Sequence, residues 1–304
     1  MPGDRMDHRY LSKDNQITAT VMPIPKTDIP SDSSLLIGGL RVNGLGKASS
    51  PGKPLISVVI VTMNRAAVLG DAIASVVNQR YDNIELIVVD GASHDESIEI
   101  IKAYDHAIDY WVSEPDNGIY HAMNKAIDLA TGDWLYFLGS DDVMFNCLHK
   151  VATYLTTHNT VYYGDVYLPT SHRLYAGEYT PYMLMKNNIP HQATFYPRQL
   201  FAKYRYNTDY ISSADYYLNL ICFNDAAFSY TYMPILVAAY EDTSGLSTLR
   251  LDRRFDNDFQ RILKDSFASK IYYEYVLRTS LKKFERKFLR GIIKFFKAIL
   301  PGRP

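Results

Sequence analysis

Hydrophobic residues in the middle of the chain form short, unbroken runs that end at polar or glycine residues. The runs Leu55 to Val61, Ile84 to Val89 and Trp134 to Leu138 are too short for helices and lack polar alternation, which is typical of strands buried on both faces of a sheet. Ile108 to Val112 is a fourth candidate strand. We therefore expect a central sheet with a large buried core.

Stretches of helical periodicity lie between these strands. The stretch after the first strand repeats apolar residues on one helical face, at Leu69, Ile73, Val76 and Val77. A second amphipathic helix is expected from about Asn117 to Ala130, and Ser93 with Glu96 has the spacing of a capping box. This alternation predicts an α/β fold with a mostly parallel sheet, helices on both faces, and polar strand ends gathered along one edge.

The second half of the chain has a weaker pattern. We expect a helix near 146–157, strands near 161–167 and 234–239, and helical structure from about Leu251 onward. Ser212 is a candidate N-cap, which would place Asp215 in the first turn of a helix. The irregular, tyrosine-rich stretch before it is a candidate specificity region.

Composition divides the chain into three parts. Residues 1–53 are rich in Pro, Gly, Ser and Asp with little periodicity, which predicts a flexible N-terminal extension. Residues 54–268 form the main domain, in which 54–145 has the strong strand and helix pattern and 146–268 is less regular. Residues 269–304 form a basic tail. From position 270 onward it contains ten Lys or Arg residues and only two acidic residues.

Cysteine content and hydropathy bear on the cellular compartment. Cys147 and Cys222 are too few for a disulfide framework, which fits a reducing compartment. We find neither an apolar run of about 18 residues nor an N-terminal apolar signal segment, so the sequence favours a cytoplasmic protein that does not cross a membrane.

The basic tail also has an amphipathic pattern. Its apolar residues recur at helical spacing, at Leu281, Phe284, Phe288, Ile292, Phe295 and Ile299. A cationic amphipathic helix of this kind can lie on an anionic membrane surface, which leaves peripheral attachment to the inner face of the cell membrane open. The alternative is a helix packed on its own core with a solvated basic face. Nucleic acid is not expected as a partner, because no recognised binding module accompanies the charge.

Polar residues with candidate chemistry follow the predicted strands. The parallel arrangement brings six of them to one sheet edge: Thr62, Asn64, Asp90, Asp116, Asp141 and Asp142. Carboxylates and helix N-termini at such an edge suit a nucleoside diphosphate with Mg²⁺ or Mn²⁺. The alternative for Asp141 and Asp142 is that they only start the next helix. Neither GxxxxGK[ST] nor GxGxxG is present, which argues against P-loop and dinucleotide-binding chemistry.

Five segments resemble family-2 inverting glycosyltransferases of the bacterial surface-polysaccharide type, in order and at compatible spacing. They are ISVVIVTMNR, ELIVVDGASHDES, SEPDNGIYHAMNKAIDLATGDWLYFLGSDD, HQATFY and ISSADYYL, within about Leu55 to Ser247. The resemblance implies a GT-A fold, a nucleotide-sugar donor, a divalent metal ion and direct displacement at the anomeric carbon. It also implies that 54–145 is the nucleotide-sugar-binding half and 146–268 the acceptor half of the domain.

The same resemblance suggests roles for the residues of the first half. Thr62 and Asn64 match positions that wrap the nucleotide, and Asp90 matches the carboxylate that meets the base. Asp142 matches the direct metal ligand, and Asp141 would lie beside the ribose or the water shell of the metal.

A second group of matches lies before the acidic pair. Asp116, Gly118 and Asn124 correspond to residues beside the donor, although Asp116 and Gly118 could equally form only a helix cap and a tight turn. His121 stands where relatives usually have an acidic residue, which puts any sugar contact at that position in doubt.

Two residues of the second half are candidates for the chemistry. Asp215 matches the general base, and Ala214 replaces the Glu that often precedes it. The alternative is an acidic residue that only interacts with the helix dipole. His191 could contact phosphate, acceptor or metal, or it could be a core residue.

These observations lead to one main hypothesis and two alternatives. We expect a metal-dependent inverting glycosyltransferase that moves a sugar, with UDP as the expected nucleotide, to a hydroxyl of a glycan or lipid-linked glycan. A non-catalytic nucleotide-sugar-binding paralogue would keep the sheet edge without needing Asp215. A sugar nucleotidyltransferase would need a glycine-rich basic loop after the first strand, which the sequence lacks.

Overall fold

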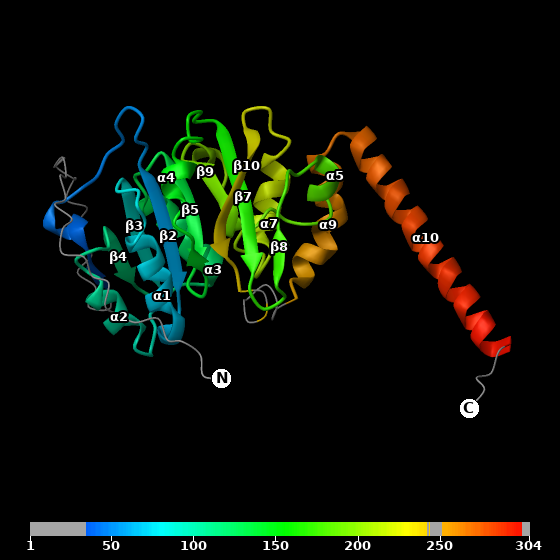
Figure 1. Cartoon of the computed structure of the whole chain (residues 1–304), viewed down its shortest axis with the longest axis horizontal. Coiled ribbons are helices and arrows are strands. Elements are labelled where there is room, and N and C mark those ends of the chain that lie inside the picture. The colour runs from blue at the N-terminus through cyan, green and yellow to red at the C-terminus, as the bar shows by residue number, and fades with distance from the viewer. Residues whose placement is uncertain (1–34, 242, 244–250, 300–304) are drawn as a thin grey trace.

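A computed structural model describes residues 35–241, 243 and 251–299. Its centre is a ten-stranded sheet in the order β1-β4-β3-β2-β5-β9-β7-β10-β6, with β8 paired to β7 (Figure 1). The strands are β1 Leu36–Gly38, β2 Ile56–Thr62, β3 Ile84–Asp90, β4 Tyr110–Ser113, β5 Trp134–Gly139, β6 Val143–Met144, β7 Thr160–Leu168, β8 Arg173–Tyr175, β9 Thr194–Pro197 and β10 Ser229–Ala239. The four strands predicted from the apolar runs are confirmed as β2, β3, β4 and β5.

The direction of the strands differs between the halves of the sheet. β4, β3, β2 and β5 are mutually parallel, as predicted. β9 is antiparallel to both β5 and β7, whereas β10 runs parallel to β7. The second half is therefore mixed, because β9 enters the sheet in the reverse direction.

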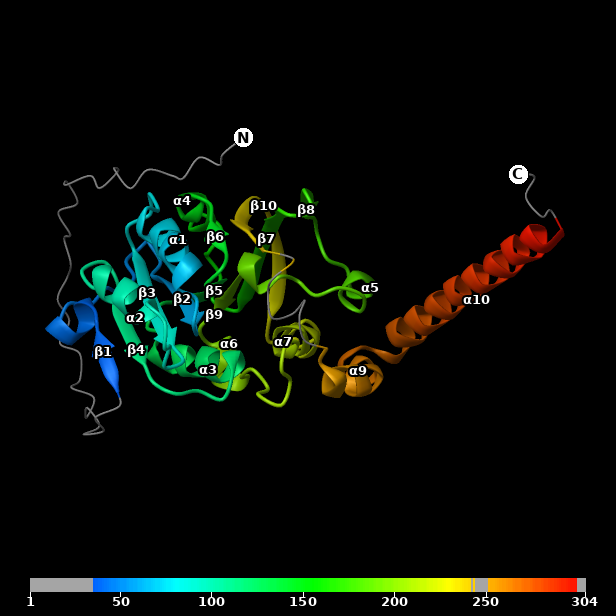
Figure 2. The same ribbon diagram turned by 90° about the horizontal axis from the view of Figure 1, so that it is seen from below.

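Helices cover both faces of the sheet (Figure 2). They are α1 Ala66–Val77, α2 Ser97–Ala103, α3 Ile119–Leu129, α4 Leu148–Val151, α5 Pro181–Leu184, α6 Leu200–Lys203, α7 Ala214–Cys222, α9 Arg253–Ser266 and α10 Ser269–Ile299, with the 3₁₀ turns η1 Leu40–Asn43 and η2 His191–Ala193. Successive residues of β2 point to opposite faces, so that Val58 and Ile60 pack with α1, and Val59 and Val61 pack with α3. Two hydrophobic cores result, one on each face.

Several predicted boundaries are wrong. The helix expected at 146–157 is only the single turn α4, followed by turns that lead into β7. The capping box of Ser93 and Glu96 is not formed: α2 begins at Ser97. Ser93 instead donates to the carboxylate of Asp90. Ser213, not Ser212, is the N-cap residue of α7, although Asp215 does lie in its first turn.

The N-terminal segment is more ordered than the sequence predicted. Residues 1–34 lie outside the described residues, but β1 adds an antiparallel edge strand to β4. The Arg41 guanidinium contacts the buried Glu85 carboxylate at 3.3 Å, and the Lys47 ammonium contacts the buried Asp109 carboxylate at 2.8 Å. Buried carboxylates need such partners, so residues 36–47 are part of the main domain rather than a flexible extension.

The C-terminal helix α10 extends away from the body of the molecule (Figures 1 and 2). Its contacts with the domain are at its first turns, where Tyr275 packs edge-on against Tyr182 of α5. Further along, the helix exposes large apolar side chains, at Leu277, Leu281, Phe284, Phe288 and Leu289. Among the described helices, none combines the length and apolar character required to cross a bilayer.

Candidate active site

The parallel strands end at a common edge, as predicted. Thr62 at the end of β2 lies opposite Asp90 at the end of β3, and Asp90 lies opposite Ser113 of β4. On the other side of β2, Val61 lies opposite Gly139, the last residue of β5. The carboxyl ends of four strands thus share the edge at which open α/β sheets bind ligands.

The nucleotide-side candidates are held by hydrogen bonds between loops. The fully buried carboxylate of Asp90 accepts from the Ser93 amide at 2.9 Å, the Ser93 hydroxyl and the Ser113 hydroxyl at 2.7 Å. Asn64, in the left-handed region at φ 53°, accepts from the His94 amide at 2.8 Å. Both side chains therefore bind and shape the two loops at this edge. The buried Thr62 hydroxyl makes no hydrogen bond with the described residues.

Asp116 and Gly118 build the turn that starts α3. The Asp116 carboxylate accepts from the Gly118 amide at 2.7 Å, and Gly118 is the N-cap at φ 109°. Asp116 also lies against the β3–α2 loop, since a Cβ added at Gly91 would come within 2.6 Å of its carboxylate. Asp116 and Gly118 thus form the turn that was the alternative to donor binding. Asp116 also lies near the loop that contains Asp90.

Asn124 lies apart from this edge. Its amide donates to the Tyr206 carbonyl at 2.9 Å, and its oxygen accepts from the Tyr206 amide at 3.0 Å. This pair of hydrogen bonds anchors the segment before α7 to α3. His121 accepts from the Asn117 amide at 3.0 Å through Nδ1, which also supports the turn.

Asp141 and Asp142 converge over Gly139. A Cβ added at Gly139 would lie 2.4 Å from Oδ2 of Asp142 and 3.1 Å from Oδ1 of Asp141, so only glycine leaves room for both carboxylates. Oδ1 of Asp142 accepts from the Glu241 amide at 3.0 Å, whereas its buried Oδ2 has no hydrogen-bond partner among the described residues. Burial, together with the neighbouring Asp141 charge, raises the pKa of Asp142 to about 6.

The Oδ2 of Asp142, unpaired among the described residues, makes the two carboxylates a candidate cation site. A buried carboxylate oxygen without a donor is unfavourable unless a ligand satisfies it. Mg²⁺ and Mn²⁺ accept one or two carboxylates and complete their shells with water and phosphate oxygens. Across the described residues no group of three or more His, Cys, Asp or Glu side chains is arranged to hold a metal ion.

Asp215 is enclosed by three donors from different elements. Its Oδ1 accepts from the Tyr120 hydroxyl at 2.9 Å, and its Oδ2 accepts from the Asn188 amide at 2.8 Å and lies 3.0 Å from Nδ1 of His191. Burial acts to raise the pKa of Asp215, but the bonds from His191 and Tyr120 outweigh it and hold that pKa below its usual range. Asp215 is therefore an ionised carboxylate at neutral pH.

A cavity of about 410 Å³ joins these groups. Its wall includes all four candidates of the catalytic centre, Asp141, Asp142, His191 and Asp215. Aromatic side chains complete much of the rest, among them Tyr120, Tyr175, Tyr216 and Tyr240. Thr62, Asn64, Asp90, Asp116, Gly118 and Asn124 do not line this cavity. It thus brings the predicted metal ligands, base and histidine together, while the nucleotide-side residues lie outside it.

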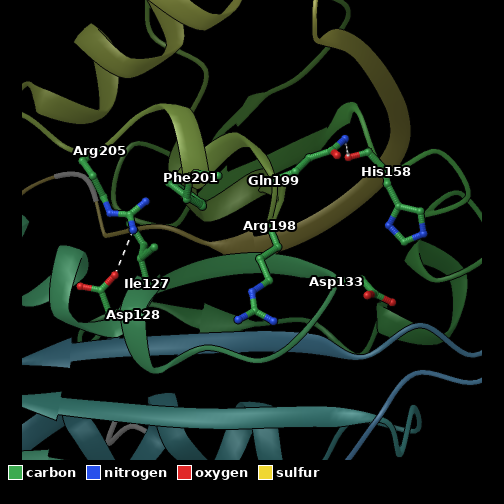
Figure 3. A pocket seen from close by; sticks show the side chains of 9 residues that line it. Ile127, Asp128, Asp133, His158, Arg198, Gln199, Phe201 and Arg205 are labelled. Carbon is green, nitrogen blue, oxygen red and sulfur yellow. Dashed lines mark hydrogen bonds and ion pairs between the residues drawn. The ribbon is translucent and has the colours of Figure 1, made fainter.

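A second, larger hollow of about 500 Å³ lies near the start of β5 (Figure 3). Arg205 on its wall pairs with Asp128 at 2.9 Å, and Arg198 donates to the Thr131 carbonyl at 3.1 Å. Asp133, which precedes β5, also lines it, so this hollow is at the opposite end of that strand from Gly139. It contains none of the predicted site residues.

Comparison with known proteins identifies the family of the chain. The family model described as glycosyl transferase family 2 matches residues 57–217. A PGL/p-HBAD biosynthesis glycosyltransferase of Mycobacterium tuberculosis is 37% identical over 211 residues, covering 66% of this chain and 82% of the relative. The chain belongs to glycosyl transferase family 2. This membership supports a glycosyltransferase enzyme over a nucleotidyltransferase.

Solved structures show that the glycosyltransferase has the predicted GT-A fold. S. aureus TarS 1-349 in complex with UDP-GlcNAc matches with a TM-score of 0.58 at 14% identity, covering 73% of this chain and 71% of the TarS 1-349 chain. The mannosyltransferase PcManGT from Pyrobaculum calidifontis, in complex with GDP-Man and Mn²⁺, matches with a TM-score of 0.53 at 16% identity, covering 83% of this chain and 82% of the other.

Sequence reasoning missed three residues of the glycosyltransferase site. Tyr120 and Asn188 hold Asp215, yet they lie 95 and 27 positions away from it. Arg65 lies 3.9 Å from the Asp141 carboxylate. The Arg65 position directly after the Thr62–Asn64 turn is a signal that could have found it. Asn188 stands in an irregular segment with no periodicity, so it offers no such signal.

Proposed function

We propose that the enzyme transfers a sugar, with inversion, from a UDP-sugar to a hydroxyl group of a glycan or lipid-linked glycan, and that transfer depends on Mg²⁺ or Mn²⁺. The observation that carries the proposal is the shared cavity, in which the Asp141–Asp142 pair and Asp215 face the same space. Inverting transfer needs a positive charge that stabilises the leaving diphosphate and a base that deprotonates the attacking hydroxyl. Both groups must reach the same pair of bound substrates. This cavity brings both kinds of group together.

The donor would bind along the sheet edge. The loops after β2 and β3, shaped by Asn64 and Asp90, are the proposed place for the nucleotide, and Thr62 keeps a free hydroxyl there. Asp142 and Asp141 would hold the cation, and a bound divalent cation neutralises charge on the departing diphosphate. Arg65 adds a positive charge beside Asp141. The complexes named for TarS and PcManGT, with UDP-GlcNAc and with GDP-Man and Mn²⁺, support a nucleotide-sugar donor and a metal ion.

Asp215 would provide the general base for the acceptor hydroxyl. It is ionised, it reaches the cavity, and it lies on the first turn of α7 next to the pocket tyrosines. Those aromatic walls suit the apolar face of a sugar ring or the apolar part of a lipid-linked acceptor. The mycobacterial relative named for PGL/p-HBAD biosynthesis is consistent with a glycolipid-type acceptor.

We further propose that the enzyme acts in the cytoplasm as a peripheral protein on the inner face of the cell membrane. α10 projects from the domain with Phe284 and Phe288 exposed by 69% and 61%, and the tail carries ten basic residues. Exposed apolar area next to positive charge suits an anionic lipid surface. Nucleic acid is not a proposed partner.

A thermal stabilisation screen tests this function. The protein is heated with UDP- and GDP-sugars, each with Mn²⁺ and with chelator. A ligand at 100 times its dissociation constant raises the free energy of unfolding by about 2.7 kcal/mol. This raises the midpoint temperature of thermal unfolding by several degrees. We expect stabilisation by UDP-sugars with Mn²⁺. If no nucleotide sugar stabilises the protein, either with Mn²⁺ or with chelator, the proposed donor class is wrong.

A further inference from the structure

His191 lines the cavity and lies next to a paired strand of the sheet. It begins the turn η2 directly before β9, and β9 is paired on both sides, with β5 and with β7. The Thr194 hydroxyl donates to the Pro190 carbonyl at 2.8 Å and closes the turn around the histidine. The imidazole is therefore placed by the sheet itself rather than by a free loop.

The hydrogen bond to Asp215 fixes the orientation of the imidazole. Nδ1 of His191 lies 3.0 Å from Oδ2 of Asp215, and an ionised carboxylate can only accept, so Nδ1 carries the proton. Nε2 is then the basic nitrogen. It makes no hydrogen bond with the described residues, the side chain is 15% exposed, and the residue lines the cavity.

Asp215 itself is poorly suited to receive a proton directly. Its two oxygens already accept from Tyr120, Asn188 and His191, and each of these bonds favours the charged form over the protonated one. A carboxylate held in this way is a weak base, but it orients an imidazole and stabilises the positive charge that forms there.

We propose that Nε2 of His191 is the atom that takes the proton from the acceptor hydroxyl, and that Asp215 is the positioning carboxylate of this pair. The inference rests on the proposed glycosyl transfer, and it moves the base from Asp215 to His191, which Asp215 positions. His191 is then a catalytic residue, and Asn188 and Tyr120 are positioning residues that hold Asp215.

The proposed reaction is a single displacement at the anomeric carbon. The acceptor oxygen forms a bond to the anomeric carbon while its proton moves to Nε2. The bond between that carbon and the diphosphate oxygen breaks, and its electron pair leaves with the diphosphate. The imidazole becomes an imidazolium, with the Asp215 charge 3.0 Å from Nδ1, and it returns the proton to solvent after the product leaves.

Nearby ionisable groups are compatible with this role. Asp142 lines the same cavity as His191. Asp141 lies on the same wall, and Tyr120 and Asn188 contact Asp215 from α3 and from the segment before η2. Tyr120, Asn188 and Nδ1 of His191 therefore all donate to Asp215. Nε2 of His191 remains available to accept a proton from the substrate.

The test compares two substitutions in the full chain. His191→Asn keeps an amide donor near the position of Nδ1 but removes Nε2, whereas Asp215→Asn keeps Nε2 and removes the carboxylate. The measured rate is UDP release from UDP-hexoses and UDP-N-acetylhexosamines with Mn²⁺, with water as the acceptor. We expect both variants to lose about 10²-fold or more in kcat, and the double variant to lose little beyond either one. Stabilisation by UDP with Mn²⁺ should stay as in the unaltered protein.

Chemical rescue supplies a second readout. Added imidazole should restore part of the rate of His191→Ala and leave the rate of Asp215→Asn unchanged, which a purely structural role for His191 does not predict. If His191→Asn works normally while Asp215→Asn does not, the proton goes directly to Asp215 and this inference is overturned while the proposed function stands. If the unaltered protein releases UDP from none of these donors, the proposed function itself fails.

Discussion

At the residue scale, the site depends on a glycine that carries no chemistry. Gly139 ends β5, and the two carboxylates that follow fold back over its Cα. The sequence identified Asp141 and Asp142 because they follow a buried strand, and Asp215 because it follows a helix-start signal. Asn188 and Tyr120 could not be assigned to the Asp215 site in this way, because their roles depend on contacts across long stretches of chain.

The first prediction concerns Gly139→Ala. The new methyl group would lie 2.4 Å from Oδ2 of Asp142, so the carboxylate pair must move apart. We expect Mn²⁺-dependent binding of UDP to weaken by about tenfold or more, because metal sites tolerate little displacement of their ligands. Isothermal titration of UDP with and without Mn²⁺ measures the change.

Gly70→Ala is the matched control for that substitution. Gly70 lies within α1, where an added Cβ meets only Ile100 at 3.9 Å, so alanine should stabilise the fold by about 0.5–1 kcal/mol and leave UDP binding as it is. Equal UDP binding by Gly139→Ala and Gly70→Ala, each with Mn²⁺, would contradict the proposed role of the carboxylate pair.

At the scale of elements, prediction from sequence worked where one pattern dominates. The apolar runs predicted β2, β3 and β5, because a strand buried on both faces is recognised by its continuous apolar sequence alone. Its neighbours in the sheet need not be known. The three-residue strand β1 was missed because it is too short to show a period, and its place depends on pairing with β4. The helix at 146–157 was overestimated because turns replace it after Val151.

The second prediction tests how the N-terminal segment is held. Lys47→Met leaves the buried Asp109 carboxylate with the Leu86 amide and without its cation. Losing one partner of a largely buried pair should lower the free energy of unfolding by about 3 kcal/mol at pH 7. Urea unfolding measures the loss. Lys53→Met is the control, because Lys53 and Asp82 form an exposed pair for which we expect about 0.5 kcal/mol or less.

The pH dependence of this loss has a definite sign. Burial raises the pKa of Asp109 even with Lys47 in place, so the folded-state pKa lies above the unfolded value and the charged form weakens folding at higher pH. Without Lys47 that pKa rises further. The difference between Lys47→Met and the unaltered protein should therefore be largest at neutral pH and shrink as the pH falls toward the folded-state pKa. A difference that grows on acidification would rule out this explanation.

At the scale of the whole molecule, the chain combines a closed domain with one projecting helix. The mixed direction of the second half of the sheet could not be derived from the sequence, because it depends on which distant strand β9 joins. The C-terminal helix was predicted, and its separation from the core is visible in the structure (Figure 1). The alternative, a tail packed on the core, is contradicted at Leu277, Leu281, Phe284, Phe288 and Leu289, whose side chains are exposed.

The third prediction concerns membrane attachment. A chain that ends at Ser280 should lose binding to vesicles of anionic lipid in a sedimentation assay, while UDP release from a UDP-sugar persists, because the site lies within the domain. Phe284→Ser with Phe288→Ser keeps every charge and should also weaken binding. Raising salt from 0.1 M to 1 M shortens the Debye length from about 10 Å to about 3 Å and should reduce, but not abolish, binding of the full chain. Full-length protein that ignores anionic vesicles would refute the proposed attachment.

The central claim is that Asp142 and a divalent cation activate a nucleotide sugar in the cavity that also holds Asp215. Its most direct test is the rate of UDP release from UDP-sugars by the unaltered protein and by Asp142→Asn, each with Mn²⁺ and with chelator. We expect release only with Mn²⁺, and a loss of about 10²-fold or more in the variant, because a neutral amide is a weak ligand for a hard cation. Asp82→Asn, at an exposed carboxylate, should release UDP at the normal rate. Release at equal rates with chelator and with Mn²⁺, or at the normal rate in Asp142→Asn, would contradict the claim.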